Sequence, residues 1–164
     1  MAERTGRPCK TPGSSRSEII RGIKSEDINP NLRLFGGRLM SWMDEIAGLT
    51  AMRHAGTSVT TAAVDNLQFL KPVMMGDIIV MIAAVTYVGG TSLEVRVDVY
   101  KEELGTGRRV EINRAYFTEV CIDGEGHPAR VPYDIVPETD AERAEMHAAR
   151  KRIEMRRIRR QQGF

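Results

Sequence analysis

The stretch that decides the fold is NPNLRLFGGRLMSWMDEIAGLTAMRH, residues 29 to 54. Pro30 disfavours helical geometry at Asn29, so the helical pattern begins later, at the Gly36–Gly37 pair. On a helical wheel one side carries Leu39, Met43, Ile46, Ala47, Thr50 and His54, and the opposite side carries Arg38, Ser41, Glu45 and Met52. Gly56 follows as a C-terminal stop. This stretch predicts one long amphipathic helix with a single buried face, ending at about His54.

The segments on either side of this helix read as strands. SEIIRGI (17–23) is a short strand, TSVTTAAVDNLQF predicts a long one over 57–70, and IIVMIAAVTYV (78–88) is an apolar run of strand length. In the next strand, 93–100, alternate residues are Leu or Val, and VEINRAYFTEVCI (110–122) is the last. Because glycine-containing turns join neighbours, the strands pair antiparallel. The expected fold is α+β, a five-stranded antiparallel sheet wrapped around one long helix.

The two ends of the chain differ from this central part. Residues 1–16 are rich in Pro, Gly and Ser and are expected to be a disordered arm. Three prolines make 127–138 an extended segment, after which Thr139 and Glu142 form a capping box for a second helix reaching toward Gln162. The expected organisation is an N-terminal arm over 1–16, one domain over 17–137 and a basic C-terminal helix or tail over 138–164.

Composition restricts the class of protein. A chain of 164 residues fits one domain, and 41% hydrophobic with 28% charged residues is the balance of a soluble globular protein. No apolar run approaches the roughly 20 residues of a membrane span, and the N-terminus has no apolar signal region, so we expect a cytoplasmic protein. A net charge of +2 argues against a polyanion binder. Cys9 and Cys121, without a CxxC pair, predict neither a disulfide framework nor a zinc site.

Positive charge is concentrated in the predicted C-terminal helix. Seven basic residues oppose the single acid Glu154 there: Arg150, Lys151, Arg152, Arg156, Arg157, Arg159 and Arg160. Such a run can bind RNA or an anionic membrane. The alternative, which we favour, is a solvated helix that packs on a neighbouring subunit through Ala144, Ala148, Ile153 or Ile158, so a nucleic-acid partner is not expected.

Four segments carry a resemblance to a known family: residues 29–44, VDNLQFLKPVMMGD (64–77), VGGTSLEV (88–95) and AYFTEVCIDGEGHPARVP (115–132). In order and spacing they resemble hotdog-fold acyl-CoA thioesterases, in the branch that includes bacterial YciA and the brain-type acyl-CoA hydrolases. The resemblance covers residues 17–137. It implies an acyl-CoA hydrolase of fatty acid metabolism that forms edge-to-edge dimers with a continuous sheet, three dimers making a homohexamer. It also implies active sites at the dimer interface and no cofactor, because coenzyme A is part of the substrate.

Thioester hydrolysis requires a polarised carbonyl, an activated water and a stabilised oxyanion. Backbone NH groups at Gly36 and Gly37 would meet the first and third needs, and Asp44 would be the general base or nucleophile. Asn29 would orient the water or bind the carbonyl. At about 1.5 Å per residue, Gly37 and Asp44 are roughly 10 Å apart along the helix. We therefore expect Asp44 of one subunit to meet the helix N-terminus of the other.

Each of these residues has a structural alternative. Gly36 and Gly37 can simply turn the chain into the helix, Asp44 can be a solvated or salt-bridged carboxylate, and Asn29 can start a turn. One departure concerns Leu32, because the family often has glycine at that position.

Coenzyme A has its own candidate residues. Gly89, Gly90, Thr91 and Ser92 match the edge along which the family binds pantetheine, and Arg53, Lys71, Arg108 and Arg109 are candidates for the nucleotide phosphates. Any one of these cations can equally be a solvated surface charge. His54 reads as structural, and His127 and His147 lack the spacing of metal ligands, so no metal site is expected.

Two other functions stay open. Asp27-Ile28-Asn29-Pro30 resembles the start of the hotdog hydratase or dehydratase signature, but Leu32 stands where that signature has its catalytic histidine. A non-catalytic acyl-CoA binding protein with a nucleic-acid-binding tail is the third possibility.

Overall fold

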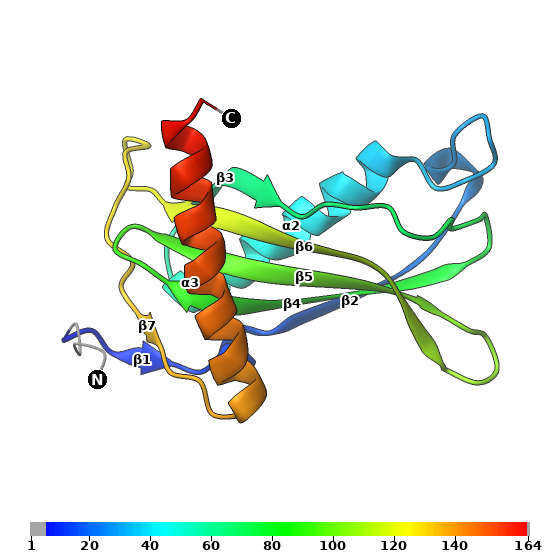
Figure 1. Ribbon diagram of the computed structural model, residues 1–164. Helices are drawn as coiled ribbons and strands as arrows, with labels where there is room; N and C mark the ends of the chain where they lie inside the picture. Colours follow the sequence, from blue (N-terminus) through cyan, green and yellow to red (C-terminus); the bar gives the residue numbers. More distant parts are fainter. Residues whose placement is uncertain (1–5, 164) are drawn as a thin grey trace.

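Five strands form one antiparallel sheet in the order β2-β4-β5-β6-β3, and a long helix, α2, lies along one face (Figure 1). The computed structural model describes residues 6–163. The elements are β1 (Cys9–Lys10), α1 (Pro12–Ser15), β2 (Ser17–Gly22), the 3-10 turn η1 (Ser25–Asp27), α2 (Gly36–Ala55), β3 (Val59–Asp65), β4 (Ile78–Val88), β5 (Ser92–Glu102), β6 (Arg109–Cys121), β7 (Asp134–Ile135) and α3 (Asp140–Gln161). The expected α+β hotdog architecture is confirmed.

The helix α2 and the sheet bury a common core. All six residues assigned to the apolar side of the helix are buried, and the four assigned to the opposite side are exposed. From the sheet, Leu93, Val95, Val97 and Val99 face α2 and are at most 1% exposed. Gly56 ends the helix with φ of 72°, a left-handed conformation that glycine adopts without strain, and its NH donates to Met52 O. The period of the sequence therefore predicted this interface correctly.

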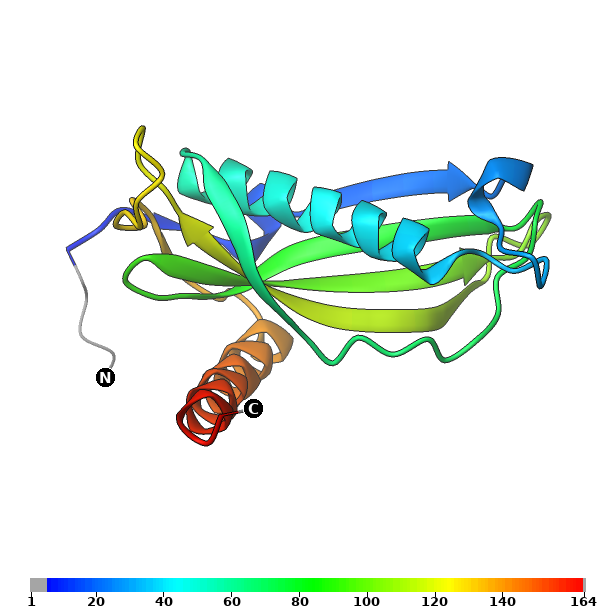
Figure 2. The ribbon, with the colours of Figure 1, turned by 90° about the horizontal axis from the view of Figure 1, so that it is seen from above.

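Strand β3 is shorter than expected. It spans Val59–Asp65 rather than 57–70, and it pairs only with β6. Asn66 follows with φ of 59°, which turns the chain out of extended geometry. Residues 66–77 then run as a loop to the end of the sheet where α2 begins (Figure 2). Because β3 lies at the edge of the sheet, its outer side has no partner strand in the protomer.

The N-terminal arm is ordered from Gly6, which corrects the prediction of a disordered segment for residues 6–16; residues 1–5 lie outside the described residues. β1 pairs in parallel with β7. Lys10 Nζ donates to the carbonyl oxygens of Arg53 and His54, at 2.9 and 2.7 Å, and so satisfies the C-terminal end of α2. The composition suggested disorder because it does not reveal these long-range partners.

The helix α3 crosses the face of the sheet opposite α2 (Figure 2). Its capping box is present as predicted, with Glu142 N donating to Thr139 Oγ1. The expectation that this helix is solvated or packs on a neighbouring subunit is wrong for its inner side. Ala149 is fully buried, and Arg152 Nη2 lies 2.7 Å from Glu94 Oε1 on β5. Glu94 is only 2% exposed, so α3 covers this charge on β5.

Candidate active site

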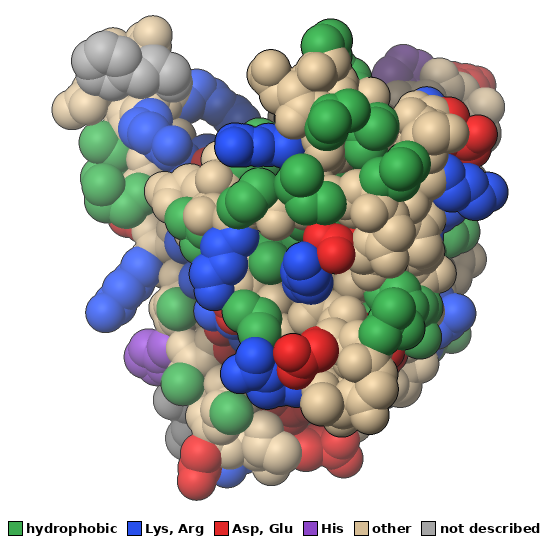
Figure 3. All heavy atoms as spheres, turned by 90° about the vertical axis from the view of Figure 1, so that its right-hand side faces the viewer, with side chains coloured by type: hydrophobic (Ala, Val, Ile, Leu, Met, Phe, Trp, Pro, Cys, Tyr) green, Lys and Arg blue, Asp and Glu red, His purple; other side chains and the backbone are tan. Residues whose placement is uncertain are grey.

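One end of the molecule collects the loop before α2, the N-terminus of α2 and the loop 66–77 (Figures 1 and 2). Figure 3 views this end and shows hydrophobic side chains gathered there among Lys and Arg. A cavity of about 430 Å³ opens between these segments. Its lining includes Asn29, Gly36, Leu39, Phe69, Lys71 and Asn113. The fold thus brings two predicted site residues, Asn29 and Gly36, to one hollow beside a predicted phosphate ligand, Lys71.

Asn29 both closes a turn and faces the cavity. Its Oδ1 accepts hydrogen bonds from the backbone NH groups of Asn31 and Arg33, at 2.9 and 3.2 Å. The turn chemistry considered for this residue is therefore present. Because a ligand carbonyl only accepts hydrogen bonds, a bond to it from Asn29 would come from the side-chain NH₂ group, while Oδ1 stays in the turn.

Leu32 occupies the tip of the same turn with φ of 58° and is 64% exposed. A glycine adopts this left-handed conformation freely, whereas a leucine is strained there by about 1–2 kcal/mol. Leu32 N nonetheless donates to Asn29 O at 2.9 Å. The turn therefore keeps the geometry that a glycine would favour, in spite of the departure noted in the sequence.

Gly36 and Gly37 begin α2, as predicted. The NH groups of Arg38 and Leu39 donate to Phe35 O, at 2.9 and 3.2 Å, while in the described part of the chain no backbone carbonyl accepts the NH of Gly36 or Gly37. A Cβ atom on Gly37 would lie 2.7 Å from the Phe35 ring, and one on Gly36 would lie 3.1 Å from the Phe69 ring. The glycines thus leave donors at the positive end of the helix and also admit two exposed aromatic rings.

Asp44 lies exposed on α2, facing the edge strand β3. Thr61 Oγ1 lies 2.7 Å from Asp44 Oδ1, and the same hydroxyl lies 3.1 and 3.3 Å from the two oxygens of Glu119 on β6. The neighbouring Ala47 and Ala51 are fully buried in the core. Their small side chains therefore pack in the core and leave no open space beside Asp44. Asp44 is therefore neither simply solvated nor in a salt bridge, but hydrogen-bonded at the edge of the sheet.

Glu119 is a fully buried carboxyl on the core side of the sheet. Burial raises its pKa to about 7, the Thr61 hydroxyl opposes that change, and the nearby charge of Asp44 adds to it. Thr61 and Glu119 are direct cross-strand neighbours, so the backbone register fixes their approach. Asp44, Thr61 and Glu119 form one hydrogen-bonded cluster drawn from α2, β3 and β6.

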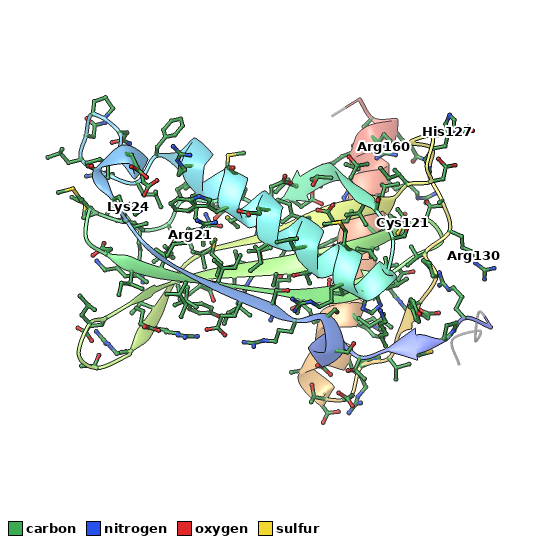
Figure 4. The ribbon with its side chains drawn as sticks, turned by 180° about the vertical axis from the view of Figure 1, so that it is seen from behind. Arg21, Lys24, Cys121, His127, Arg130 and Arg160 are labelled. Atoms are coloured by element: carbon green, nitrogen blue, oxygen red, sulfur yellow. The ribbon has the colours of Figure 1, made fainter. Side chains whose placement is uncertain are left out.

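The predicted pantetheine turn, Gly89 to Ser92, lies at the opposite end of the sheet. Its neighbouring segment carries His127 and Arg130, which Figure 4 shows far from Lys24. All four of its carbonyls already accept hydrogen bonds: Gly89 O from Arg7 Nη1, Gly90 O from Val131 N, Thr91 O from Cys121 N, and Ser92 O from Gly89 N. The protomer therefore does not bring this turn to the cavity beside Asn29. A shared site would require a second subunit.

Of the four candidate phosphate ligands, three lie away from the cavity beside Asn29. Arg53 Nη1 donates to Arg16 O at the C-terminal end of α2. Arg108 pairs with Glu103 at 3.2 Å, and Arg109 with Glu102 and Glu18 at 2.8 and 2.9 Å. Lys71 is the one of the four that lines the cavity with Asn29 and Gly36.

His54 is fully buried, with Nδ1 3.1 Å from Ser15 Oγ. Burial and then the nearby Lys10 charge lower its pKa to about 4, which keeps the ring neutral. Within residues 6–163, no group of three or more His, Cys, Asp or Glu side chains is placed to hold a metal ion. No helix in the same range is long and apolar enough to cross a membrane.

Sequence reasoning missed Thr61, Glu119 and Asn113. Thr61 sits in a Thr/Ala-rich strand with no distinguishing signal. Glu119 did carry a signal in the sequence. It lies two residues from Phe117 and two from Cys121, so its side chain points to the same, core-facing side of the strand. Asn113 lines the cavity, is 1% exposed, and neither polar atom of its side chain has a hydrogen-bond partner among the described residues.

Comparison with known proteins identifies the family. Residues 33–107 match the model of the thioesterase superfamily. The acyl-CoA thioester hydrolase YkhA of Bacillus subtilis is 43% identical over 116 residues, 71% of this chain and 67% of that protein. The acyl-CoA thioester hydrolase YciA of Escherichia coli is 33% identical over 66% of this chain and 84% of that protein.

Comparison with solved structures supports the same family assignment. An acyl-CoA hydrolase from Staphylococcus aureus, in complex with butyryl coenzyme A and coenzyme A, superposes with a TM-score of 0.89 at 38% identity. The superposition covers 95% of this chain and 94% of that one. Other structures of the S. aureus hydrolase carry alanine in place of one asparagine, one aspartate or one threonine. The chain therefore belongs to the thioesterase superfamily, in the hotdog-fold branch of the acyl-CoA thioester hydrolases.

Proposed function

We propose that this acyl-CoA thioester hydrolase cleaves its substrate to a free acid and coenzyme A with Asp44 as the catalytic carboxylate. The observation that carries the proposal is the Asp44 carboxylate itself, exposed at the edge of the sheet and held 2.7 Å from Thr61 Oγ1. The asparagine, aspartate and threonine replaced in the S. aureus hydrolase are separated along their chain as Asn29, Asp44 and Thr61 are along this one. That coincidence supports a shared role for the three side chains.

The chemistry divides between the N-terminus of α2 and Asp44 in the middle of the same helix. The thioester carbonyl accepts hydrogen bonds from the unpaired NH groups at Gly36 and Gly37 and from the side-chain NH₂ of Asn29. Asp44 removes a proton from a water molecule as that water attacks the carbonyl carbon. The oxyanion that forms is stabilised by the same donors. Collapse of the tetrahedral intermediate then breaks the carbon–sulfur bond and releases coenzyme A as the thiolate, which takes up the proton held by Asp44.

The site requires a second copy of the chain. Asp44 points toward the edge strand β3, while Asn29 and the first turn of α2 lie at one end of the sheet. A two-fold dimer paired through β3 would extend the sheet and place Asp44 of one subunit against the helix N-terminus of the other. It would also bring the Gly89–Ser92 turn of one subunit toward the cavity of its partner, with Lys71 as the nearest phosphate ligand. Hexameric acyl-CoA thioesterases are among the similar solved structures, which supports a trimer of such dimers.

The test follows free thiol release from a panel of acyl-CoAs, from acetyl to palmitoyl. Wild-type protein should release thiol from at least part of the panel, and Asp44→Ala should lose almost all of that activity while remaining folded and assembled. Asp140→Ala, an exposed aspartate on α3, is the matched control and should behave as wild type. Full activity in Asp44→Ala would exclude the proposed mechanism. Hydration of an enoyl-CoA without thiol release would favour the hydratase class instead.

A further inference from the structure

A buried glutamate stands directly behind the proposed catalytic carboxylate. We infer that Glu119 is a positioning residue that, in its protonated form, orients Asp44 through the Thr61 hydroxyl. The inference rests on the proposed role of Asp44. It adds a fourth side chain to Asn29, Asp44 and Thr61, from a strand, β6, that carries no other proposed catalytic group.

The argument begins with the hydrogen atoms available. The Thr61 hydroxyl has one proton and two lone pairs. Its oxygen lies 2.7 Å from Asp44 Oδ1 and 3.1 Å from Glu119 Oε1. If it donates to Asp44, it can only accept from Glu119, so Glu119 must carry a proton. The ordered arrangement is therefore a chain in which Glu119 donates to Thr61 and Thr61 donates to Asp44.

The surroundings of Glu119 favour that protonated form. The side chain is fully buried between Leu93 on β5 and Thr61 on β3, with Phe117 and Cys121 on the same side of β6. Among the described residues, Asp44 on α2 is the charged group that acts on it, and its negative charge also opposes ionisation. Burial, with the charge of Asp44 adding to its effect, raises the pKa of Glu119 to about 7.

The arrangement makes Asp44 orientation depend on pH. While Glu119 holds its proton, Asp44 Oδ1 is fixed by Thr61, and Asp44 Oδ2 remains available to receive a proton from water. When Glu119 ionises, two carboxylates compete for the one Thr61 proton, and the buried anion draws that proton away from Asp44. Asp44 then loses the hydrogen bond that fixes its rotamer. The predicted consequence is a fall in kcat as Glu119 ionises.

The experiment measures kcat and KM for a cleaved acyl-CoA across pH in the wild type and two variants. Glu119→Gln keeps the shape and a permanent NH donor toward Thr61. Glu119→Met keeps the length but removes the donor. Glu125→Gln, on an exposed turn, is the matched control. Circular dichroism and size-exclusion chromatography report folding and assembly of each protein.

The inference predicts a decline in wild-type kcat with a midpoint near pH 7, where Glu119 ionises. Glu119→Gln should keep the kcat of the low-pH wild type within about threefold and lose that decline. Glu119→Met should lower kcat about tenfold at low pH, the effect of one lost hydrogen bond, with little change in KM. Glu125→Gln should match the wild type.

The outcome that overturns the inference is a Glu119→Gln profile with the same inflection as the wild type, or a folded Glu119→Met with wild-type kcat. If Glu119→Met does not fold, the near-isosteric Glu119→Gln decides the question alone. If Asp44→Ala is inactive while both Glu119 variants match the wild type, only the positioning role fails. If Asp44→Ala is active, the proposed function itself fails.

Discussion

Replacing Glu119 by glutamine should change how stability depends on pH. A carboxyl whose pKa rises from 4.5 to about 7 on folding keeps a proton that the unfolded chain has already released. The folded state binds more protons between these values, so the free energy of unfolding falls as pH rises through this window. Below 4.5 the effect is absent, and above about 7 it is complete, at about 3 kcal/mol. Glutamine removes this titration.

The assay is urea unfolding of the wild type and Glu119→Gln at equal protein concentration, followed through the fluorescence of the single tryptophan, the buried Trp42. The quantity to compare is the difference in unfolding free energy between the two proteins at each pH. That difference should move in favour of the variant by about 3 kcal/mol across the window. His54 titrates with the opposite sign, since its pKa is lowered to about 4, but it is present in both proteins and cancels. Two curves that run parallel across this pH range would refute the view that Glu119 is held neutral.

Three further predictions concern other parts of the fold. Leu32→Gly should leave the melting temperature unchanged or raise it, because φ of 58° suits glycine, whereas Leu32→Val should cost about 1 kcal/mol; a more stable valine variant would contradict the strained turn. Gly37→Ala should change the unfolding free energy by less than about 1 kcal/mol yet lower kcat/KM for acyl-CoA, because the added methyl group obstructs the NH donors; unchanged kcat/KM would make the glycine pair purely structural. Arg152→Met should cost about 2 kcal/mol in denaturant unfolding, since it removes the closest cation from the buried Glu94 and leaves that carboxylate the Thr86 hydroxyl at 2.7 Å and Arg156 at 3.5 Å. Arg157→Met, whose partner Glu154 is exposed, should cost almost nothing, and equal effects would be inconsistent with the role given to α3.

The parts of the fold that could be predicted are those that follow from the spacing of apolar and polar residues close together in the sequence. The apolar face of α2, the alternation of Leu93 to Val99 and the capping box at Thr139 each depend on neighbours a few residues away, so the sequence pattern determines them. The start of α2 at Gly36 was also predictable, because Pro30 disfavours helical geometry at Asn29 and the helical pattern begins only at the Gly36–Gly37 pair.

The parts that could not be predicted depend on distant partners. The arm before Ser17 is ordered because Lys10 reaches the end of α2, and α3 stays on its own sheet because Arg152 meets Glu94. Neither partner is adjacent in sequence. The Asp44–Thr61–Glu119 cluster likewise requires the register of β3 on β6, which no single segment encodes. Glu119 alone gave a local signal. It is a charged residue at a core-facing position of its strand, which indicates a role other than core packing.

The central claim is that each active site combines Asp44 of one subunit with Asn29 and the α2 N-terminus of its partner. Co-expression of Asp44→Ala and Asn29→Ala chains with different affinity tags, followed by purification through both tags, tests it directly. In a mixed dimer one site carries both substitutions and the other carries neither. The account predicts that the mixed protein releases thiol from acyl-CoA far faster than either parent variant does. Activity no higher than that of the parents would place both residues in the same subunit's site and contradict the account.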